Sequence, residues 1–414
     1  MRRTEAVVIG GGQAGLAMSR SLSQHGIDHV VLERGRVGER WRSERWDSLR
    51  LLSPNWHTRL PGFRYDGPNP DGFMRVGELV GLLERYARTI GAPVEEQTKV
   101  LAVEPGGPGY RVTTDHGGFE ARSVVIATGH CDVPDVPHVA TRLPADVVQL
   151  VPSRYRRASQ LPAGGVLVVG ASASGVQLAD EIHASGRPVT LAVGRHNRLP
   201  RSYRGRDIVW WLDAMGVFDE AAEDVSDLAR TRSQPSLQLV GRPDRATLDL
   251  PALEHRGVRL AGRLKAIEGG RVRFADDLVA HTAAADARLA RLVQRIDAFA
   301  DESGLDGAIG PREPFAPFLW PSPAPTELDL GQAGIRSVVW ATGYRREYPW
   351  LRVPVLDERG EIRHVGGITP APGLYVLGLQ FLRRRNSSFL DGVGEDAAAL
   401  VDHLARRLAH RRAA

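Results

Sequence analysis

Two segments of the chain follow the same order of patterns: a short apolar run, a glycine-rich turn, a stretch with helical spacing and a second apolar run. The first begins at residues 6–10 (AVVIG) and ends on 28–35 (DHVVLERG), and the second begins at 166–170 (VLVVG) and ends on 189–194 (VTLAVG). A buried strand, a helix and a second strand in this order form a βαβ unit with parallel strands. We therefore predict an α/β fold with two Rossmann-like dinucleotide-binding domains.

The first turn carries Gly10, Gly12 and Gly15 at the G-x-G-x-x-G spacing. In a dinucleotide site the first glycine permits a tight turn, the second lets the backbone approach a pyrophosphate, and the third allows close packing of helix on strand. Glu33 follows 18 residues after Gly15, where a carboxylate accepts hydrogen bonds from a ribose and repels a 2′-phosphate. These features predict FAD at this unit. The alternative, a turn that serves packing alone, leaves the coincidence of strand, glycines, helix and acid unexplained.

The second turn carries Gly170, Ser172 and Gly175, with serine in place of the middle glycine. Where the first unit has an acid after its second strand, this unit has Arg195 followed by His196. Cations at this place suit a ribose 2′-phosphate, so we predict that the unit binds NADPH in preference to NADH. The alternative, that these cations are ordinary solvated charges, stays open because the chain is rich in arginine.

Two different nucleotide sites in one chain predict hydride transfer from NADPH to FAD. The segment from Gly170 to Ser174 also resembles a nucleophile elbow, but the sequence places no Asp and His partners beside it, which argues against a hydrolase. Neighbours of the glycines and of Glu33 are further candidates for cofactor binding: Gln13, Ala14, Arg34, Ala173 and Ser174.

The composition excludes several classes of protein. With 414 residues and 42% hydrophobic residues, the chain is long and apolar enough for two or three globular units. Cys131 is the single cysteine, which excludes an intramolecular disulfide, a dithiol redox pair and a thiolate metal cluster. The arginines are dispersed rather than clustered, so we expect no nucleic-acid partner. The N-terminus lacks a signal-peptide pattern and no apolar run suggests a membrane span, so we expect a cytoplasmic protein.

Two near-repeats bracket the second unit: ARSVVIATG ends on Thr128 and Gly129, and IRSVVWATG ends on Thr342 and Gly343. Glycines at strand ends let the main chain pass close beneath a cofactor, so we interpret these segments as the two passages between the domains. The predicted division is an FAD domain of residues 1–145 and 332–414, with an NADPH domain of 146–331 inserted. A pair of apolar runs around a Gly-Gly turn at 263–274 predicts an added antiparallel β-ribbon.

The C-terminal segment predicts a buried strand ending at Gly378 and a final helix that begins near 391–396. Such a helix would direct its positive end at the flavin pyrimidine, and Asp391 is a candidate contact, although capping of the helix is the alternative role for the acids there. Residues 284–300 predict a helix that packs on the core. The proline-rich run 311–325 predicts a loop with no assigned chemistry.

With these residues in view, the chain resembles the class B flavin monooxygenases, which include N-oxygenating enzymes. The two Ala-Thr-Gly passages carry this resemblance, together with residues 38–55 (GERWRSERWDSLRLLSPN), which are similar to the flavin-adjacent stretch of plant auxin-forming flavin monooxygenases. The residues that keep its register are Trp41, Asp47, Leu49, Leu51 and Pro54. The resemblance implies an enzyme that oxidises NADPH, forms a C4a-(hydro)peroxyflavin with molecular oxygen and oxygenates a small organic substrate. Disulfide reductases of the same fold need a second thiol, which this chain lacks.

The chain departs from the family pattern at three places. The positions of the family fingerprint fall on Ala145, Val147, Val151 and Tyr155, of which only the tyrosine matches. Leu52 occupies the position where animal-type members carry an asparagine beside the flavin, and Ser172 replaces a glycine. The catalytic residues are therefore unknown. Two polar neighbours, Ser53 and Asn55, are candidates to compensate for Leu52, and both could instead satisfy a local turn around Pro54.

Three functions stay open at this point. The first is the FAD- and NADPH-dependent monooxygenase, for which Trp41 and Leu52 are expected to lie beside the flavin. The second is an NADPH oxidase or reductase that inserts no oxygen. The third is a redox-silent FAD- and NADP-binding sensor. A homodimer also stays open.

Overall fold

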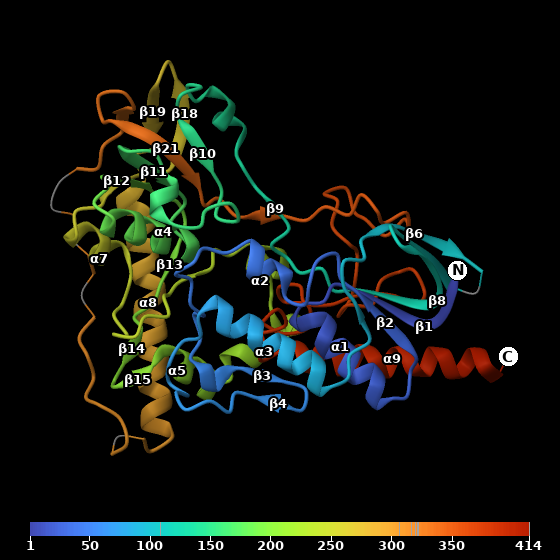
Figure 1. Ribbon diagram of the computed structural model, residues 1–414. Coiled ribbons are helices and arrows are strands. Elements are labelled where there is room, and N and C mark those ends of the chain that lie inside the picture. The colour runs from blue at the N-terminus through green and yellow to red at the C-terminus, as the bar shows by residue number, and fades with distance from the viewer. Residues whose placement is uncertain (108, 306, 316, 319, 321–322, 414) are drawn as a thin grey trace.

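Two bodies, each built on a parallel sheet, make up the fold of the computed structural model, and two chain passages connect them (Figure 1). The structure describes residues 1–413 apart from 108, 306, 316, 319 and 321–322. Helices and antiparallel additions surround both sheets, and the structure therefore confirms the predicted α/β class.

The sheet of the first body has the strand order β5-β2-β1-β8-β7-β6. Strand β7 pairs with the first half of β8, and β23 pairs with its last residues. Strands β1, β2, β5, β8 and β23 are mutually parallel, whereas β6, β7 and β8 pair antiparallel. The strands are β1 (Arg2–Ile9), β2 (His29–Leu32), β5 (Val94–Glu95), β6 (Val100–Gly106), β7 (Gly109–Thr114), β8 (Gly117–Ile126) and β23 (Leu374–Val376). Near-continuous apolar runs form the second half of β1, β2 and the end of β8, because these parts of the sheet are covered on both faces.

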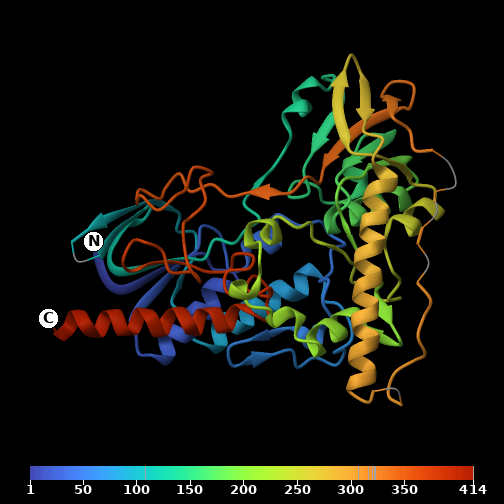
Figure 2. The same ribbon diagram turned by 180° about the vertical axis from the view of Figure 1, so that it is seen from behind.

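Three helices pack beside this sheet: α1 (Gln13–Gln24), α3 (Val76–Thr89) and α9 (Val393–Ala413). Helix α1 contacts both α3 and α9, although α9 comes from the opposite end of the chain. The first body is therefore discontinuous in sequence, with the blue and red ends of the chain side by side in Figures 1 and 2.

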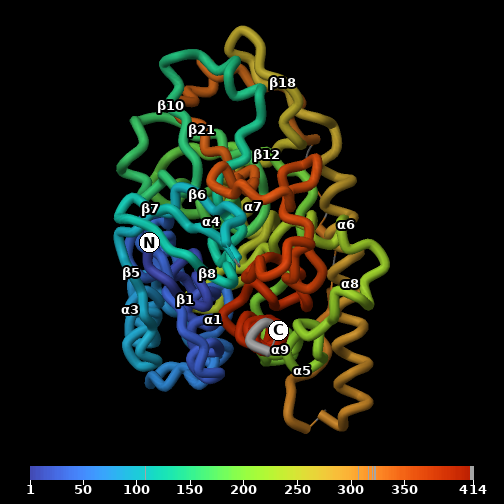
Figure 3. The backbone as a smooth tube through the Cα atoms, turned by 90° about the vertical axis from the view of Figure 1, so that its right-hand side faces the viewer, coloured from blue at the N-terminus to red at the C-terminus, as the bar shows by residue number. Residues whose placement is uncertain are grey.

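The second body contains a five-stranded parallel sheet in the order β10-β21-β11-β12-β17. Its strands are β10 (Val148–Leu150), β11 (Gly165–Val169), β12 (Val189–Ala192), β17 (Arg259–Ala261) and β21 (Ile335–Trp340). Strand β21 pairs with both β10 and β11, and Figure 3 shows it beside β10. The boundary predicted at residue 332 is therefore too early, because the second Ala-Thr-Gly segment completes the second sheet before the chain returns to the first body.

Antiparallel strands extend the second body as predicted. Strands β18 (Leu264–Glu268), β19 (Arg271–Phe274) and β20 (Glu327–Asp329) form a three-stranded sheet. The helix expected over 284–300 is present and longer, as α8 (Leu278–Glu302), with Leu289 and Ile296 buried. The described residues of the run 311–325 form no helix or strand; residues 316, 319 and 321–322 of that run lie outside the description.

Two short strands join the bodies: β9 (Val133–Pro134) pairs antiparallel with β22 (Tyr344–Arg345), so the outgoing and returning passages run together. The remaining strands are β3 (Arg59–Leu60), β4 (Phe63–Arg64), β13 (Asn197–Arg198), β14 (Ser202–Tyr203), β15 (Arg206–Asp207) and β16 (Leu237–Gln238). The remaining α-helices are α2 (Glu39–Ser43), α4 (Ala173–Ala184), α5 (Ile208–Ala214), α6 (Leu228–Arg232) and α7 (Leu250–His255). The 3₁₀ helices among the described residues are η1 (Asn55–His57), η2 (His138–Arg142), η3 (Ala158–Gln160), η4 (Val217–Asp219) and η5 (Ala222–Asp224).

A second connection between the bodies comes from residues 208–232, which we call the crossing segment. Its Ala222 N–H donates to the Arg383 carbonyl, and its Phe218 carbonyl accepts from the Asn386 N–H. An ion pair joins Glu220 to Arg385. These contacts hold the second body against the C-terminal part of the first in addition to the paired passages. No helix among the described residues is long and apolar enough to cross a membrane.

Candidate functional site

The first glycine turn lies directly against the end of β8. Gly10 has a φ of +115°, and a Cβ there would lie 2.5 Å from the Ala127 carbonyl oxygen. A Cβ on Gly15 would lie 1.8 Å from the Gly10 carbonyl oxygen, so both positions require glycine. A Cβ on Gly12 would meet no atom within 4 Å, and its φ of −88° suits any residue. Packing of the protein itself therefore does not require glycine at position 12, and the backbone there is open to the approach of a ligand.

Helix α1 begins at this open position, and no side chain caps its N-terminus. Its N-cap is Gly12, and no acid lies in its first turn. Uncapped N–H groups and the helix dipole together favour a phosphate at this end of the helix. The turn thus fits the pyrophosphate of a dinucleotide by its open backbone and its unused donors.

Glu33 lies at the end of β2 beside the same turn, with 9% of its surface exposed. Its two carboxylate oxygens accept hydrogen bonds from the Gly11 N–H at 2.7 Å and the Gly35 N–H at 2.8 Å. These bonds fix the carboxylate in place, and each oxygen keeps acceptor capacity for a ribose hydroxyl. Arg34 is exposed and its guanidinium lies 3.3 Å from Glu44.

Residues from three distant segments meet at the start of α1. The Trp41 indole N–H donates to the Gln13 side chain at 3.4 Å, and the Gln13 amide donates to the Ser388 carbonyl at 3.4 Å. A Cβ on Gly378 would lie 2.8 Å from the Cβ of Ala14. The structure therefore brings four of the predicted cofactor residues, Gln13, Ala14, Trp41 and Gly378, to one place next to the first glycine turn.

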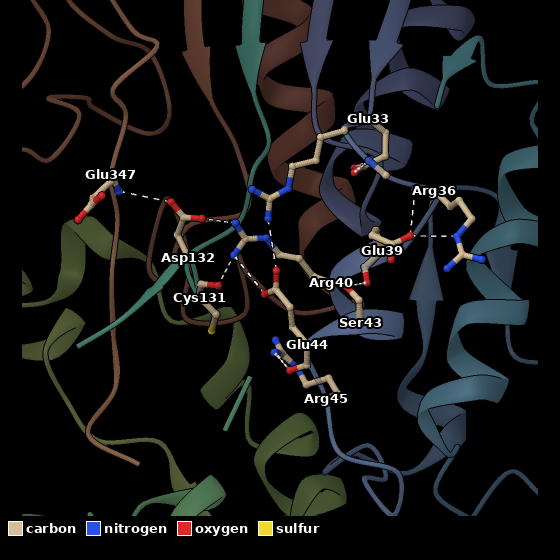
Figure 4. A network of polar contacts seen from close by, with 12 residues as sticks. Glu33, Arg36, Glu39, Arg40, Ser43, Glu44, Arg45, Cys131, Asp132 and Glu347 are labelled. Carbon is tan, nitrogen blue, oxygen red and sulfur yellow. Dashed lines mark hydrogen bonds and ion pairs between the residues drawn. The ribbon is translucent and has the colours of Figure 1, made fainter. Parts of the chain in front are cut away.

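The passage that follows Thr128 and Gly129 is anchored by α2 (Figure 4). The Arg40 guanidinium donates to the Cys131 carbonyl and pairs with Asp132, whose other oxygen accepts from the Glu347 N–H at 3.4 Å. Arg40 thus ties both passages to the first body. Burial opposes ionisation of the Cys131 thiol, but His130 and two neighbouring guanidinium groups outweigh it and lower the pKa of Cys131.

The flavin-adjacent stretch predicted from the sequence contains two catalytic candidates, which differ in their contacts. The Asn55 side chain is 4% exposed and donates to the Asn69 carbonyl at 2.9 Å, while its oxygen accepts from the Met74 N–H at 2.8 Å. These bonds favour the local structural role for Asn55. Ser53 forms no hydrogen bond through its hydroxyl among the described residues, so its role stays a prediction. The Leu52 side chain is partly buried against the apolar cluster of α5 and α8.

Sequence analysis did not single out Arg201. This residue of the second body contacts Leu52 of the first body. Its side chain is 1% exposed, donates to the Leu52 carbonyl at 2.6 Å and pairs with Asp207. Its guanidinium carbon lies 4.9 Å from the centroid of the Phe73 ring. Burial lowers the pKa of Arg201, and the Asp207 carboxylate opposes this effect.

A second charged cluster also spans the bodies, with one histidine, one arginine and two acids. Arg59 lies 2.6 Å from Asp213 of the crossing segment and pairs with Asp391 as well. The His57 Nε2 lies 3.5 Å and 3.6 Å from the same two carboxylates, and burial lowers the pKa of His57. These side chains could offer three ligands to a metal ion, but the Arg59 cation already occupies the place between the carboxylates. Asp391, predicted to contact the cofactor, is thus engaged in this cluster.

The buried acid Asp396 lies in the first turn of α9, where the sequence suggested a cap. It is 1% exposed, and its Oδ2 has no hydrogen-bond partner among the described residues. Burial raises the pKa of Asp396 to about 6, although the Ser387 hydroxyl and two arginines favour the charged form.

We expect Asp396→Asn to flatten the dependence of stability on pH. Because the folded pKa of Asp396 is about 6 against 3.8 unfolded, folding favours the protonated acid, and this contribution is lost as the pH rises through 6. The variant should therefore gain up to about 3 kcal/mol of unfolding free energy relative to wild type between pH 4 and pH 8. Urea denaturation at both pH values measures this. The exposed neighbour Glu395→Gln is the control, and parallel pH profiles for wild type and Asp396→Asn would refute the assignment.

The second glycine turn repeats the geometry of the first. Gly170 has a φ of +103°, and a Cβ there would lie 2.3 Å from the Ala341 carbonyl oxygen. A Cβ on Gly175 would lie 1.8 Å from the Gly170 carbonyl oxygen. Ser172 is the N-cap of α4, and no side chain caps that helix. Ala173 is buried and Ser174 is half-buried in its first turn. Each turn thus lies against the alanine of one Ala-Thr-Gly segment. Thr342 and Gly343 therefore follow the second turn's contact in the chain as Thr128 and Gly129 follow the first.

The loop after β12 carries the predicted cations. Arg195 is exposed, whereas His196 is 1% exposed and its Nδ1 lies 3.0 Å from the Gly194 carbonyl oxygen. Burial lowers the pKa of His196, so its ring is neutral and the charge of this loop comes from arginine. Arg198 pairs with Asp249 and Asp286, each at 2.7 Å, and is therefore neutralised.

Comparison with known proteins agrees with this geometry. Residues 7–213 match the family model described as pyridine nucleotide-disulphide oxidoreductase. An uncharacterised CzcO-like oxidoreductase of Geobacillus kaustophilus is 32% identical over 404 residues, which cover 97% of this chain and 98% of that one. The chain belongs to the pyridine nucleotide-disulphide oxidoreductase family. It is an oxidoreductase with a flavin site and a nicotinamide nucleotide site.

Two further similarities confirm the resemblance to flavin monooxygenases. The indole-3-pyruvate monooxygenase YUCCA1 of Oryza sativa is 30% identical over 208 residues, 48% of this chain and 50% of that enzyme. The solved structure of a flavin-containing monooxygenase from Stenotrophomonas maltophilia superposes with a TM-score of 0.67 at 19% identity, covering 98% of this chain and 99% of that one. This last similarity establishes the shared fold of this oxidoreductase.

Proposed function

We propose that this oxidoreductase is an FAD- and NADPH-dependent monooxygenase that oxygenates a small organic substrate. The observation that carries the proposal is the pair of equivalent glycine turns, one beside the fixed acid Glu33 and the other beside the cation Arg195. The acid suits the unphosphorylated ribose of FAD, and the cation suits the 2′-phosphate of NADPH. Similarity over half the chain to an indole-3-pyruvate monooxygenase supports oxygen insertion as the outcome.

In this proposal the chain binds, orients and shields the reactants. The N–H groups at the start of α1 and α4 hold the two pyrophosphates, and Glu33 holds the FAD ribose. Bound flavin would supply the hydride acceptor and the centre that activates oxygen. Leu52 lies within the flavin-adjacent stretch and Trp56 directly after it, and both pack against an apolar cluster that includes residues of α5 and α8. Apolar walls of this kind exclude water and favour a small substrate with little charge.

Product analysis tests oxygen insertion. Protein loaded with FAD is mixed with NADPH in air, with and without a panel of small amines and thioethers, and both oxygenated product and hydrogen peroxide are quantified. We expect at least one compound to be converted in proportion to the NADPH consumed. If hydrogen peroxide accounts for all NADPH with every compound, the monooxygenase assignment is wrong.

The second candidate is an NADPH oxidase that releases hydrogen peroxide. Two observations favour it: Leu52 offers no polar side chain at its position, and both ends of the Asn55 amide are already bonded to backbone. If neither residue donates to activated oxygen, that oxygen is released more readily. The same product analysis separates the two candidates.

A further inference from the structure

Helix α8 supports the cation-bearing loop of the second nucleotide unit. The Arg288 Nη2 donates to the His196 carbonyl at 2.6 Å, and its Nε donates to the Asn197 side-chain oxygen at 3.0 Å. These bonds use the edge of the guanidinium formed by Nε and Nη2, and the Nη1 group keeps its donors for another partner. A residue nearly a hundred positions away in sequence thus shapes the loop that follows β12.

Arg195, Arg288 and Arg291 lie near one another at the loop that follows β12. Burial lowers the pKa of Arg288, and the positive charges of Arg291 and Arg195 lower it further. Among the described residues, no aspartate or glutamate forms an ion pair with any of the three. By contrast, Arg198 on the same loop is neutralised by two buried aspartates. The fold therefore leaves an uncompensated positive charge beside the end of β12, which is the place of the ribose in a dinucleotide unit.

We propose that Arg288 is a second specificity-determining residue, which binds the 2′-phosphate of NADPH together with Arg195. This inference rests on the proposed use of NADPH at the second unit. A phosphate monoester carries up to two negative charges at neutral pH and accepts several hydrogen bonds, which two guanidinium groups from different elements satisfy better than one. Arg195 contributes from the loop and Arg288 from α8, so the phosphate would lie between two segments.

Substitutions on α8 separate phosphate binding from support of the loop. We expect Arg288→Ala to raise the dissociation constant for NADPH about tenfold or more, because the loss of one charge-assisted hydrogen bond weakens binding by about this factor. The constant for NADH should change less than about twofold, and Arg288→Lys should retain part of the NADPH preference. Arg295→Ala is the matched control: it removes an exposed arginine of the same helix, and we expect no change. Equal weakening of NADPH and NADH by Arg288→Ala would overturn the proposal and assign Arg288 to loop support alone.

A second probe keeps this inference distinct from the proposed function. Binding of adenosine 2′,5′-bisphosphate and of adenosine 5′-monophosphate is measured by calorimetry on the same holoprotein variants. Arg288→Ala should weaken only the bisphosphate, whether or not NADPH reduces the flavin. Failure of wild-type protein to oxidise NADPH would thus refute the proposed function, whereas a bisphosphate affinity that is unchanged in Arg288→Ala would refute the role of Arg288.

Discussion

Gly12→Glu should give a folded protein that holds no flavin, whereas Ser172→Glu should give a yellow protein that NADPH cannot reduce. Both residues are N-caps of the helices at the two glycine turns. A side chain added at Gly12 meets no atom of the protein within 4 Å at Cβ, so folding should be little affected. A carboxylate beside the pyrophosphate repels it and fills the space it needs, and we expect at least about a 100-fold loss of affinity at the altered turn.

The matched control for this pair is Gly77→Glu. Gly77 lies exposed in the first turn of α3, where an added Cβ also meets no atom within 4 Å. Flavin content is read from visible absorbance after removal of free FAD, and folding from far-ultraviolet circular dichroism. Retention of flavin by Gly12→Glu would show that the first turn does not bind it, and loss of flavin by Gly77→Glu would show that the assay reports general damage.

Arg201→Met should lower the free energy of unfolding by about 3 kcal/mol, because it leaves the partly buried Asp207 carboxylate without its cation. The Leu52 carbonyl also loses a hydrogen bond in the interface between the two bodies. Methionine keeps much of the apolar volume next to Phe73, so the loss reflects charge rather than a cavity. Urea denaturation of the purified protein measures the change.

Arg3→Met is the control for this prediction. The Arg3 side chain is 86% exposed and pairs with Glu120, and exposed pairs of this kind contribute at most about 1 kcal/mol. If Arg201→Met is no more destabilising than Arg3→Met, Arg201 does not hold the two bodies together.

Local patterns in the sequence were sufficient to predict the parts of the site that depend on neighbouring residues. The spacing of Gly10, Gly12 and Gly15 reflects contacts within one turn, and the near-repeat of the two Ala-Thr-Gly segments reflects the same contact in each unit. The close contacts at Gly10 and Gly15 are those that the spacing predicts for a tight turn and for packing of helix on strand. Which cofactor each turn binds stays a prediction.

Contacts between distant segments could not be predicted in this way. The sequence of β21 nearly repeats the end of β8, and this similarity led to the prediction that the chain has already returned to the first body there. In the structure, β21 pairs with β10 and β11 of the second body. Asp391 follows the pattern of a helix cap, yet its partner Arg59 lies far away in sequence. Arg201 and Arg288 carry no local signal in a chain with many arginines. Their importance comes from burial and from charge balance, which only the folded arrangement determines.

Anaerobic mixing of the FAD-loaded protein with NADPH tests the two-site arrangement most directly, with flavin absorbance followed over time. We expect the yellow colour to bleach in wild-type and Gly77→Glu protein and to persist in Ser172→Glu protein. A wild-type protein that binds FAD but stays yellow with excess NADPH would contradict electron transfer between the two units.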